Sequence, residues 1–184
     1  KKKREEYLDP IKDIPVKDLI FFDESGANLQ MTPRYGRAYG SHQAVSYAPY
    51  IRGNKITMIS AISIAQVETA MYGEWSANGE IFMHFLDKYL CPLLKPNHVV
   101  VMDNVGFHKM QSIQDKIKST GARLAYQPPY HPELNPIEEM WSMIKILLRK
   151  FEARNQRAFQ KSIKKAFEAV TKSDLQGWFQ HAGL

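Results

Sequence analysis

Short apolar runs separated by polar residues predict the strands of a sheet. Residues 19–22, 99–102 and 123–126 are largely apolar and each run stops at polar residues, as buried strands do. Residues 55–64 and 67–75 are rich in β-branched side chains and lie two residues apart, which predicts an antiparallel hairpin. We therefore expect five strands.

Apolar residues spaced three or four positions apart predict helices between and after these strands. This spacing covers residues 79–93, 109–119, 137–151, 156–170 and 173–181. The order of elements is strand, hairpin, helix, strand, helix, strand and then helices. It predicts an α/β fold in which helices pack on a mixed sheet.

Two segments show neither pattern. Residues 25–54 contain several Gly and Pro residues with aromatic residues between them, so we expect a long loop or an irregular hairpin. Residues 1–17 are mostly polar and are expected to form an N-terminal linker. The folded domain is then predicted to span residues 18–184, with basic helices at its C-terminal end.

The composition excludes several classes of protein. Hydrophobic residues make up 44% of the 184 residues and charged residues 24%, as in ordinary globular proteins. A single cysteine, Cys91, forms neither an internal disulfide nor a Cys-rich zinc site, which favours a reducing compartment, the cytoplasm. No apolar run approaches the roughly 20 residues of a membrane span, and the basic start lacks the apolar region of a signal peptide. We expect no membrane partner.

The positive charge is concentrated in one segment. The chain has a formal net charge of +6, and residues 145–165 alone hold eight basic residues against one acidic residue. Residues 13–144 hold eleven basic and thirteen acidic residues. A basic excess suggests a polyanionic partner, although a solvated helix face is the simpler explanation of an isolated basic run.

Two predicted strands end in an aspartate. Asp23 follows residues 19–22, and Asp103 follows residues 99–102. Ligands and reacting groups gather at the carboxyl ends of strands in α/β sheets, so both carboxylates share one edge if these strands are parallel neighbours. Alone, either aspartate is more typical of a residue that ends a strand and begins a turn.

A third acid, Glu138, lies near the start of the amphipathic helix predicted over residues 137–151. At 100° per residue, Glu138, Lys145 and Arg149 fall within about 40° of one another on the helix, so they share one polar face. An acid at the start of a helix and bases towards its end would also be explained by favourable interaction with the helix dipole. The three acids together indicate a different chemistry. Cleaving and rejoining a phosphodiester is served by Mg²⁺ ions on carboxylate oxygens, and three crowded acids repel one another without a cation.

Three blocks of sequence carry these acids. They are residues 21–26 (FFDESG), residues 100–104 (VVMDN) with His108, and residues 128–138 (PPYHPELNPIE). Between Asp103 and Glu138 lie 34 residues. In this order and at this spacing, the blocks resemble the signature motifs of the DDE (DD34E) transposases of the mariner superfamily, in its bacterial insertion-sequence branch. The resemblance covers residues 18–184.

The resemblance implies a ribonuclease H-like fold, with a mixed five-stranded sheet and helices on both of its faces. It also implies a metal-dependent transposase in which Asp23, Asp103 and Glu138 are catalytic residues. These acids would ligate two Mg²⁺ ions, with Mn²⁺ as a substitute. Three further motif positions would support the site or touch DNA: Asn104, His108 and Asn135.

The implied reaction is cut-and-paste transposition. Phosphodiesters at the ends of the element are cleaved, and the freed 3′-hydroxyl is transferred to target DNA, at a TA dinucleotide, by a homodimer. Such transposases normally carry N-terminal helix-turn-helix domains, for which there is no room before Asp23, so we expect end recognition to come from outside this chain. His131 stands where the motif usually has a small polar residue, and it adds an imidazole near the expected metals.

Basic residues on two segments are expected to contact DNA: Lys145, Arg149, Lys150 and Arg154 after Glu138, and Arg34 and Arg37 in the loop. In the loop, Tyr35 and Tyr39 alternate with these arginines, and such rings can stack on unpaired bases, unless the loop packs on the protein's own surface. The loop glycines do not form a phosphate-cradling motif, so no nucleotide cofactor is expected, and the histidines lack zinc-site spacing.

Two other functions are compatible with these residues. The first is a nuclease or resolvase on the same fold that hydrolyses strands without joining them. The second is a domesticated, non-catalytic DNA-binding module. Attack of a 3′-hydroxyl on a second duplex would distinguish a transposase from a hydrolytic nuclease. Metal binding would distinguish it from a non-catalytic DNA-binding module.

Overall fold

The computed structural model describes residues 11, 13–33, 35–45, 47, 50, 53–103, 110–127 and 131–184. These residues contain one five-stranded sheet in the order β3-β2-β1-β4-β5. Its strands are β1 (Leu19–Ala27), β2 (Ile56–Ile62), β3 (Val67–Gly73), β4 (Val99–Met102) and β5 (Arg123–Tyr126). β1 runs antiparallel to β2 and parallel to β4, and β4 runs parallel to β5, so the predicted mixed sheet and its hairpin are confirmed.

β1 is longer than the sequence pattern predicts, and the expectation that Asp23 ends the strand is wrong. The strand continues through Asp23 to Ala27 because these residues pair antiparallel with β2, from Asp23 opposite Ser60 to Ala27 opposite Ile56. Parallel pairing with β4 covers only Leu19 to Phe21. The second half of β1 therefore extends beyond β4 along β2.

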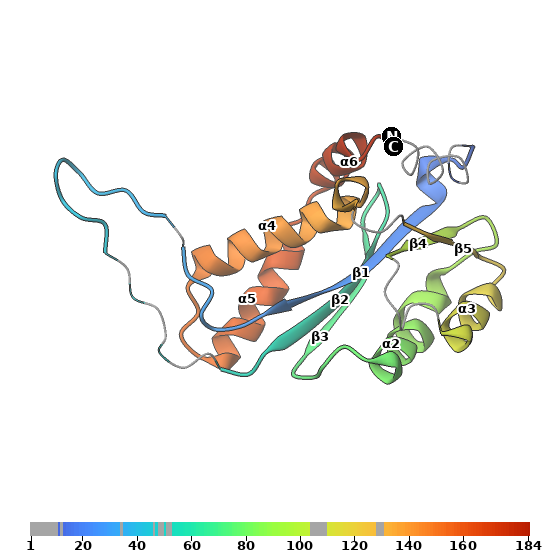
Figure 1. Ribbon diagram of the computed structural model, residues 1–184, viewed down its shortest axis with the longest axis horizontal. Helices are drawn as coiled ribbons and strands as arrows, with labels where there is room; N and C mark the ends of the chain where they lie inside the picture. The colour runs from blue at the N-terminus through green and yellow to red at the C-terminus, as the bar shows by residue number, and fades with distance from the viewer. Residues whose placement is uncertain are drawn as a thin grey trace.

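Helices cover both faces of the sheet, as expected (Figure 1). α4 (Pro136–Phe151), α5 (Gln156–Glu168) and α6 (Lys172–His181) cover one face, while α2 (Gly79–Phe85) and α3 (Gln111–Lys118) cover the other. Successive residues of β1 point to opposite faces of the sheet. Accordingly Phe21 packs with Trp141 and Phe179, whereas Phe22 packs with Phe82 and Phe85.

The helix expected over residues 79–93 changes its hydrogen bonding after its second turn. Residues Leu86–Leu90 form a π turn and Cys91–Leu93 a 3₁₀ turn. Pro92 explains the change, because it has no N–H to donate to the carbonyl of Lys88 four residues earlier. Short 3₁₀ turns also occur at Val16–Asp18, before β1, and at Pro132–Leu134, before α4.

The segment between β1 and β2, residues 28–55, is here called the β1–β2 loop. Where it is described it forms neither strand nor helix, and it projects from the body of the protein (Figure 1, blue to cyan). Tyr35 and Tyr39 are 93% and 94% exposed, so these rings do not pack on the protein's own surface. In the expected linker, Ile11 is buried in the core under α4 to α6. Within the described parts of the chain, no helix has the length and apolar character to cross a membrane.

Candidate active site

Asp23 and Asp103 lie at the same edge of the sheet. The last parallel pair of β1 and β4 is Phe21 with Val101, and each aspartate is two residues beyond it. Paired strands lie about 4.8 Å apart, so equal positions on the two chains are neighbours. The sequence expectation that parallel strands bring both carboxylates to one edge is confirmed.

α4 begins beside these aspartates. Pro136 occupies its first turn, where a missing N–H costs nothing, and Asn135 precedes it as the N-cap. Glu138 lies in the first turn, and the helix packs across β1 through a buried stripe that comprises Ile137, Met140, Trp141, Ile144 and Leu148. The stripe fixes which face of the helix packs on the sheet.

A buried hydrogen bond connects α4 to β1. The indole Nε1 of Trp141 donates to Oδ2 of Asp23 over 3.1 Å. Trp141 follows Glu138 by three residues and so lies about one turn along the same helix. The bond holds the Asp23 carboxylate in one orientation at the start of α4.

Negative charges converge on Asp23. Its side chain is only 7% exposed, and its pKa is raised well above the ordinary value, first because burial disfavours the ionised form. The charges of Glu24, Glu138 and Asp103 raise the pKa further, while a hydrogen bond with the backbone of Glu24 lowers it. Glu138 and Asp103 therefore each lie within electrostatic reach of Asp23. A bound cation would relieve this repulsion.

The chemistry of the donors fits a hard divalent cation, because carboxylate oxygens are the preferred ligands of Mg²⁺. Within the described residues, no three side chains of His, Cys, Asp or Glu already stand together closely enough to hold one ion. The cluster consists of acids that approach one another without closing around a common point. Binding an ion would require these side chains to move closer together, and Glu138 and Asp103 are more exposed than Asp23.

Only some of the predicted supporting residues lie in the described part of the chain. Asn104, His108 and Arg34 fall outside the described residues. Asn135 is 5% exposed, and its Oδ1 has no hydrogen-bond partner among the described atoms. His131 contacts Glu133, with 2.8 Å between Nδ1 and Oε1, so that carboxylate fixes the orientation of the imidazole.

The predicted DNA-contacting residues that are described all reach the surface. Lys145 and Arg149 are half-buried on α4, whereas Lys150, Arg154 and Arg37 are exposed. Arg154 donates to Glu152 over 2.6 Å. These positions are compatible with DNA contact.

Two interactions were not predicted from the sequence. Trp141 packs in the core and also donates a hydrogen bond to Asp23. His181, near the end of α6, contacts Glu139 with 2.6 Å between Nδ1 and Oε1. The spacing of three residues between Glu138 and Trp141 indicates that Trp141 lies near the acidic site. Nothing in the sequence indicates that Glu139 contacts His181.

Replacing Asp23 by Asn should stabilise the metal-free protein at neutral pH. Because the folded-state pKa of Asp23 is raised, its contribution to stability is complete below the ordinary pKa and is lost as pH rises through the raised pKa. At pH 7 the D23N variant avoids that loss and can still accept the Trp141 hydrogen bond. We therefore expect D23N to have a higher Tm than the wild type at pH 7.

Thermal unfolding in EDTA between pH 3.5 and 8 measures this gain. It should shrink towards the acid end of the range, and the exposed Asp13→Asn should show no gain. A D23N protein less stable than wild type at pH 7 would contradict the electrostatic description of the site.

A mixed sheet of this order, with acids at one edge between β1, β4 and α4, defines a protein of the ribonuclease H-like class with an acidic site. The sequence model of the family described as DDE superfamily endonuclease matches residues 18–160. The chain belongs to this family, as the resemblance of its motifs predicted. Its assignment to the bacterial insertion-sequence branch stays a prediction.

Solved structures of a mariner transposase share the fold. The pre-cleavage Mos1 transpososome has a TM-score of 0.76 at 15% identity, covering 97% of this chain and 57% of that chain. The Mos1 strand transfer complex has a TM-score of 0.78 at 15% identity, covering 97% of this chain and 56% of that chain. The catalytic domain of Mos1 mariner transposase has a TM-score of 0.69 at 11% identity, covering 97% of this chain and 84% of that chain.

The chain thus spans little more than half the length of the transposase in these complexes. The predicted ribonuclease H-like architecture is confirmed by these likenesses. No curated protein sequence matches the chain.

Proposed function

We propose that the chain is the catalytic domain of a DNA transposase that cleaves phosphodiesters at the ends of an element and transfers the 3′-hydroxyl to target DNA. Asp23, Asp103 and Glu138 are the proposed metal ligands, for two Mg²⁺ ions or for Mn²⁺. The observation that carries the proposal is that Asp103 and Glu138 lie within electrostatic reach of the buried Asp23, in a chain of the DDE endonuclease family. Structures of the Mos1 paired-end complex with Mn and with Mg support divalent ions here.

Each acid has a distinct task in this proposal. Asp23 is held by the central strand and by Trp141, so it provides a fixed anchor. Asp103 and Glu138 come from the end of β4 and the start of α4 and complete the site from two sides. When bound, divalent ions lower the pKa of the attacking water or 3′-hydroxyl and neutralise charge on the leaving oxygen.

DNA is the proposed partner, as element ends and as target. Lys145 and Arg149 follow Glu138 along α4, and the basic segment 145–165 continues into α5. Cations next to an acidic metal site hold a phosphate backbone where the acids alone would repel it. We further propose cut-and-paste at a TA dinucleotide, an active homodimer, and a place in the cytoplasm on nucleoid DNA. The similar structures include a Mos1 paired-end complex, which supports the homodimer.

The direct test of the function is strand cleavage and joining by the full-length protein with Mg²⁺ or Mn²⁺. A labelled element end should be cleaved and its 3′ end should appear covalently joined to a second duplex. Cleavage without any joined product would assign the chain to a hydrolytic nuclease instead. Neither cleavage nor joining, with DNA binding intact, would favour a non-catalytic DNA-binding module.

Charge reversal at Lys145 and Arg149 should weaken DNA binding. Each DNA phosphate that the protein no longer neutralises reduces the slope of log K against log salt by about 0.9, so the double Glu variant should have a slope smaller by about two units. At about 0.1 M salt we expect at least a tenfold weaker affinity.

Fluorescence anisotropy with labelled duplex from 50 to 300 mM salt measures both quantities. The matched control reverses Lys88 and Lys118, two exposed lysines on the opposite face of the sheet. Equal decreases in affinity for both double variants would show that only the net charge matters. Unchanged binding would show that Lys145 and Arg149 belong to a solvated helix face.

A further inference from the structure

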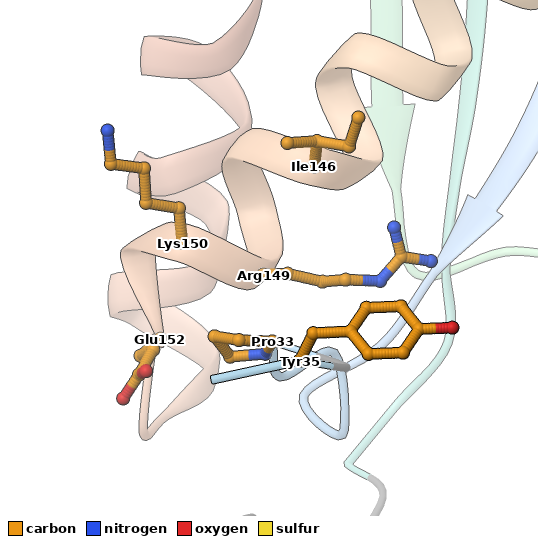
Figure 2. Close-up of a pocket in the computed structure, with 6 residues that line it drawn as sticks. All are labelled: Pro33, Tyr35, Ile146, Arg149, Lys150 and Glu152. Carbon is orange, nitrogen blue, oxygen red and sulfur yellow. The ribbon is translucent and has the colours of Figure 1, made fainter. Parts of the chain in front are cut away.

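A cavity of about 540 Å³ lies between the β1–β2 loop and the end of α4. Figure 2 shows the side chains around it. Residues from two elements line it: Pro33, Tyr35, Ile146, Arg149, Lys150 and Glu152. We call it the Tyr35 pocket. Its volume lies in the range of sites that bind small organic groups.

The apolar walls of the Tyr35 pocket have no packing partner in the fold. Tyr35 is 93% exposed, and Ile146, on a helix whose apolar stripe is otherwise buried, is 58% exposed. Exposed apolar groups that gather at a hollow are typical of ligand-binding surfaces. Because the Tyr35 ring is not packed, its presence does not help the chain to fold.

Positive charge lies beside these walls. Across the described residues, neither Arg149 nor Lys150 forms an ion pair or a hydrogen bond through its side chain, and the lining carboxylate of Glu152 is already bonded to Arg154. Figure 2 shows the Arg149 side chain running along the Tyr35 ring, whereas Lys150 is directed away from it. The pocket therefore offers a flat aromatic face next to an unneutralised guanidinium.

An aromatic face beside a cation fits a nucleotide whose base is unpaired. Base–aromatic stacking and phosphate contacts to Arg and Lys are the two interactions that bind single strands without sequence preference. A base inside a duplex is stacked on its neighbours and cannot reach such a ring. A duplex would use only the cations.

We propose that the Tyr35 pocket binds one unpaired nucleotide of a DNA strand, its base stacked on the Tyr35 ring and its phosphate at Arg149. This inference rests on the proposed function only in taking DNA as the substrate. Arg149 follows Glu138 by eleven residues, about 16 Å along the helix axis. The nucleotide in the pocket is thus separate from the phosphodiester that reacts, and the pocket holds a flanking single-stranded segment.

The test compares single-stranded and duplex binding in EDTA, where no chemistry occurs. The probes are a labelled ten-nucleotide oligo-dT and a hairpin duplex of matched length, measured by fluorescence anisotropy. Tyr35→Ala should weaken oligo-dT binding at least fivefold and change duplex binding less than twofold. Tyr35→Phe should keep wild-type affinity, and so should Tyr50→Ala, which removes a tyrosine of the same loop that is 98% exposed and outside the pocket.

Three results would overturn the inference. They are unchanged oligo-dT binding by Tyr35→Ala, an equal decrease for oligo-dT and duplex, and no oligo-dT binding by the wild-type protein. If Tyr35→Ala instead changed self-association in sedimentation, with oligo-dT binding unchanged, the pocket would belong to an interface between copies. None of these results depends on strand cleavage, so failure here is distinct from failure of the proposed function.

Discussion

Replacing Glu138 by Gln or Asp103 by Asn should lower strand cleavage by the full-length protein by at least about a thousandfold. Both amides keep the size of the side chain and remove one negative oxygen ligand from the proposed metal site. Divalent ions contribute several kcal/mol of charge stabilisation in such reactions, and each 1.36 kcal/mol is a factor of ten in rate. The decrease should appear in the rate and not in the affinity for DNA.

The matched control is Glu139→Gln. Glu139 neighbours Glu138 in the first turn of α4, but it contacts His181 and does not contribute to the raised pKa of Asp23. Its cleavage rate should stay within about threefold of wild type. Wild-type rates for E138Q and D103N, or an equal decrease for E139Q, would refute the assignment of the three acids.

Trp141→Ala should destabilise the chain by about 3–5 kcal/mol, as truncation of a fully buried aromatic residue does. Trp141 is 1% exposed, packs at right angles to Phe167 and donates the hydrogen bond to Asp23. Trp141→Phe separates these roles, because it keeps most of the packing and removes the indole donor. It should cost about 1–3 kcal/mol, the cost of a buried acceptor left unpaired.

Urea unfolding in EDTA measures these differences, with Trp178→Phe as the matched control on the neighbouring helix α6. Trp178 is only partly buried and has no bond to Asp23, so its replacement should cost about 1 kcal/mol or less. In the D23N background the cost of Trp141→Phe should change, since the two residues are coupled. Strict additivity of W141F and D23N would show that the negative charge of Asp23 adds nothing to the hydrogen bond.

The order of elements was predictable because each has a clear period. Apolar spacing of 3.6 residues identified α4, α5 and α6, and the β-branched runs identified β2 and β3. The end of β1 was not predictable, because residues 23–27 (DESGA) are polar or small and show no strand pattern. Only pairing with β2, between residues 29 to 37 positions apart in the chain, keeps them extended.

The candidate site was predictable in its residue types and less so in its geometry. Acids after two apolar runs predicted a shared edge, and the parallel pairing of β1 and β4 confirms it. The burial of Asp23 and its bond to Trp141 depend on how α4 crosses the sheet, which no local pattern determines. The Tyr35 pocket likewise arises from the loop meeting the end of α4.

Calorimetric titration of the chain with Mn²⁺ tests the central claim most directly, because it asks whether the three acids form a metal site before any DNA chemistry. The account predicts saturable binding at millimolar or lower Mn²⁺ for the wild type and for E139Q. It also predicts that D103N and E138Q lose that binding. No binding by the wild type at millimolar Mn²⁺, or equal binding by all four proteins, would contradict it.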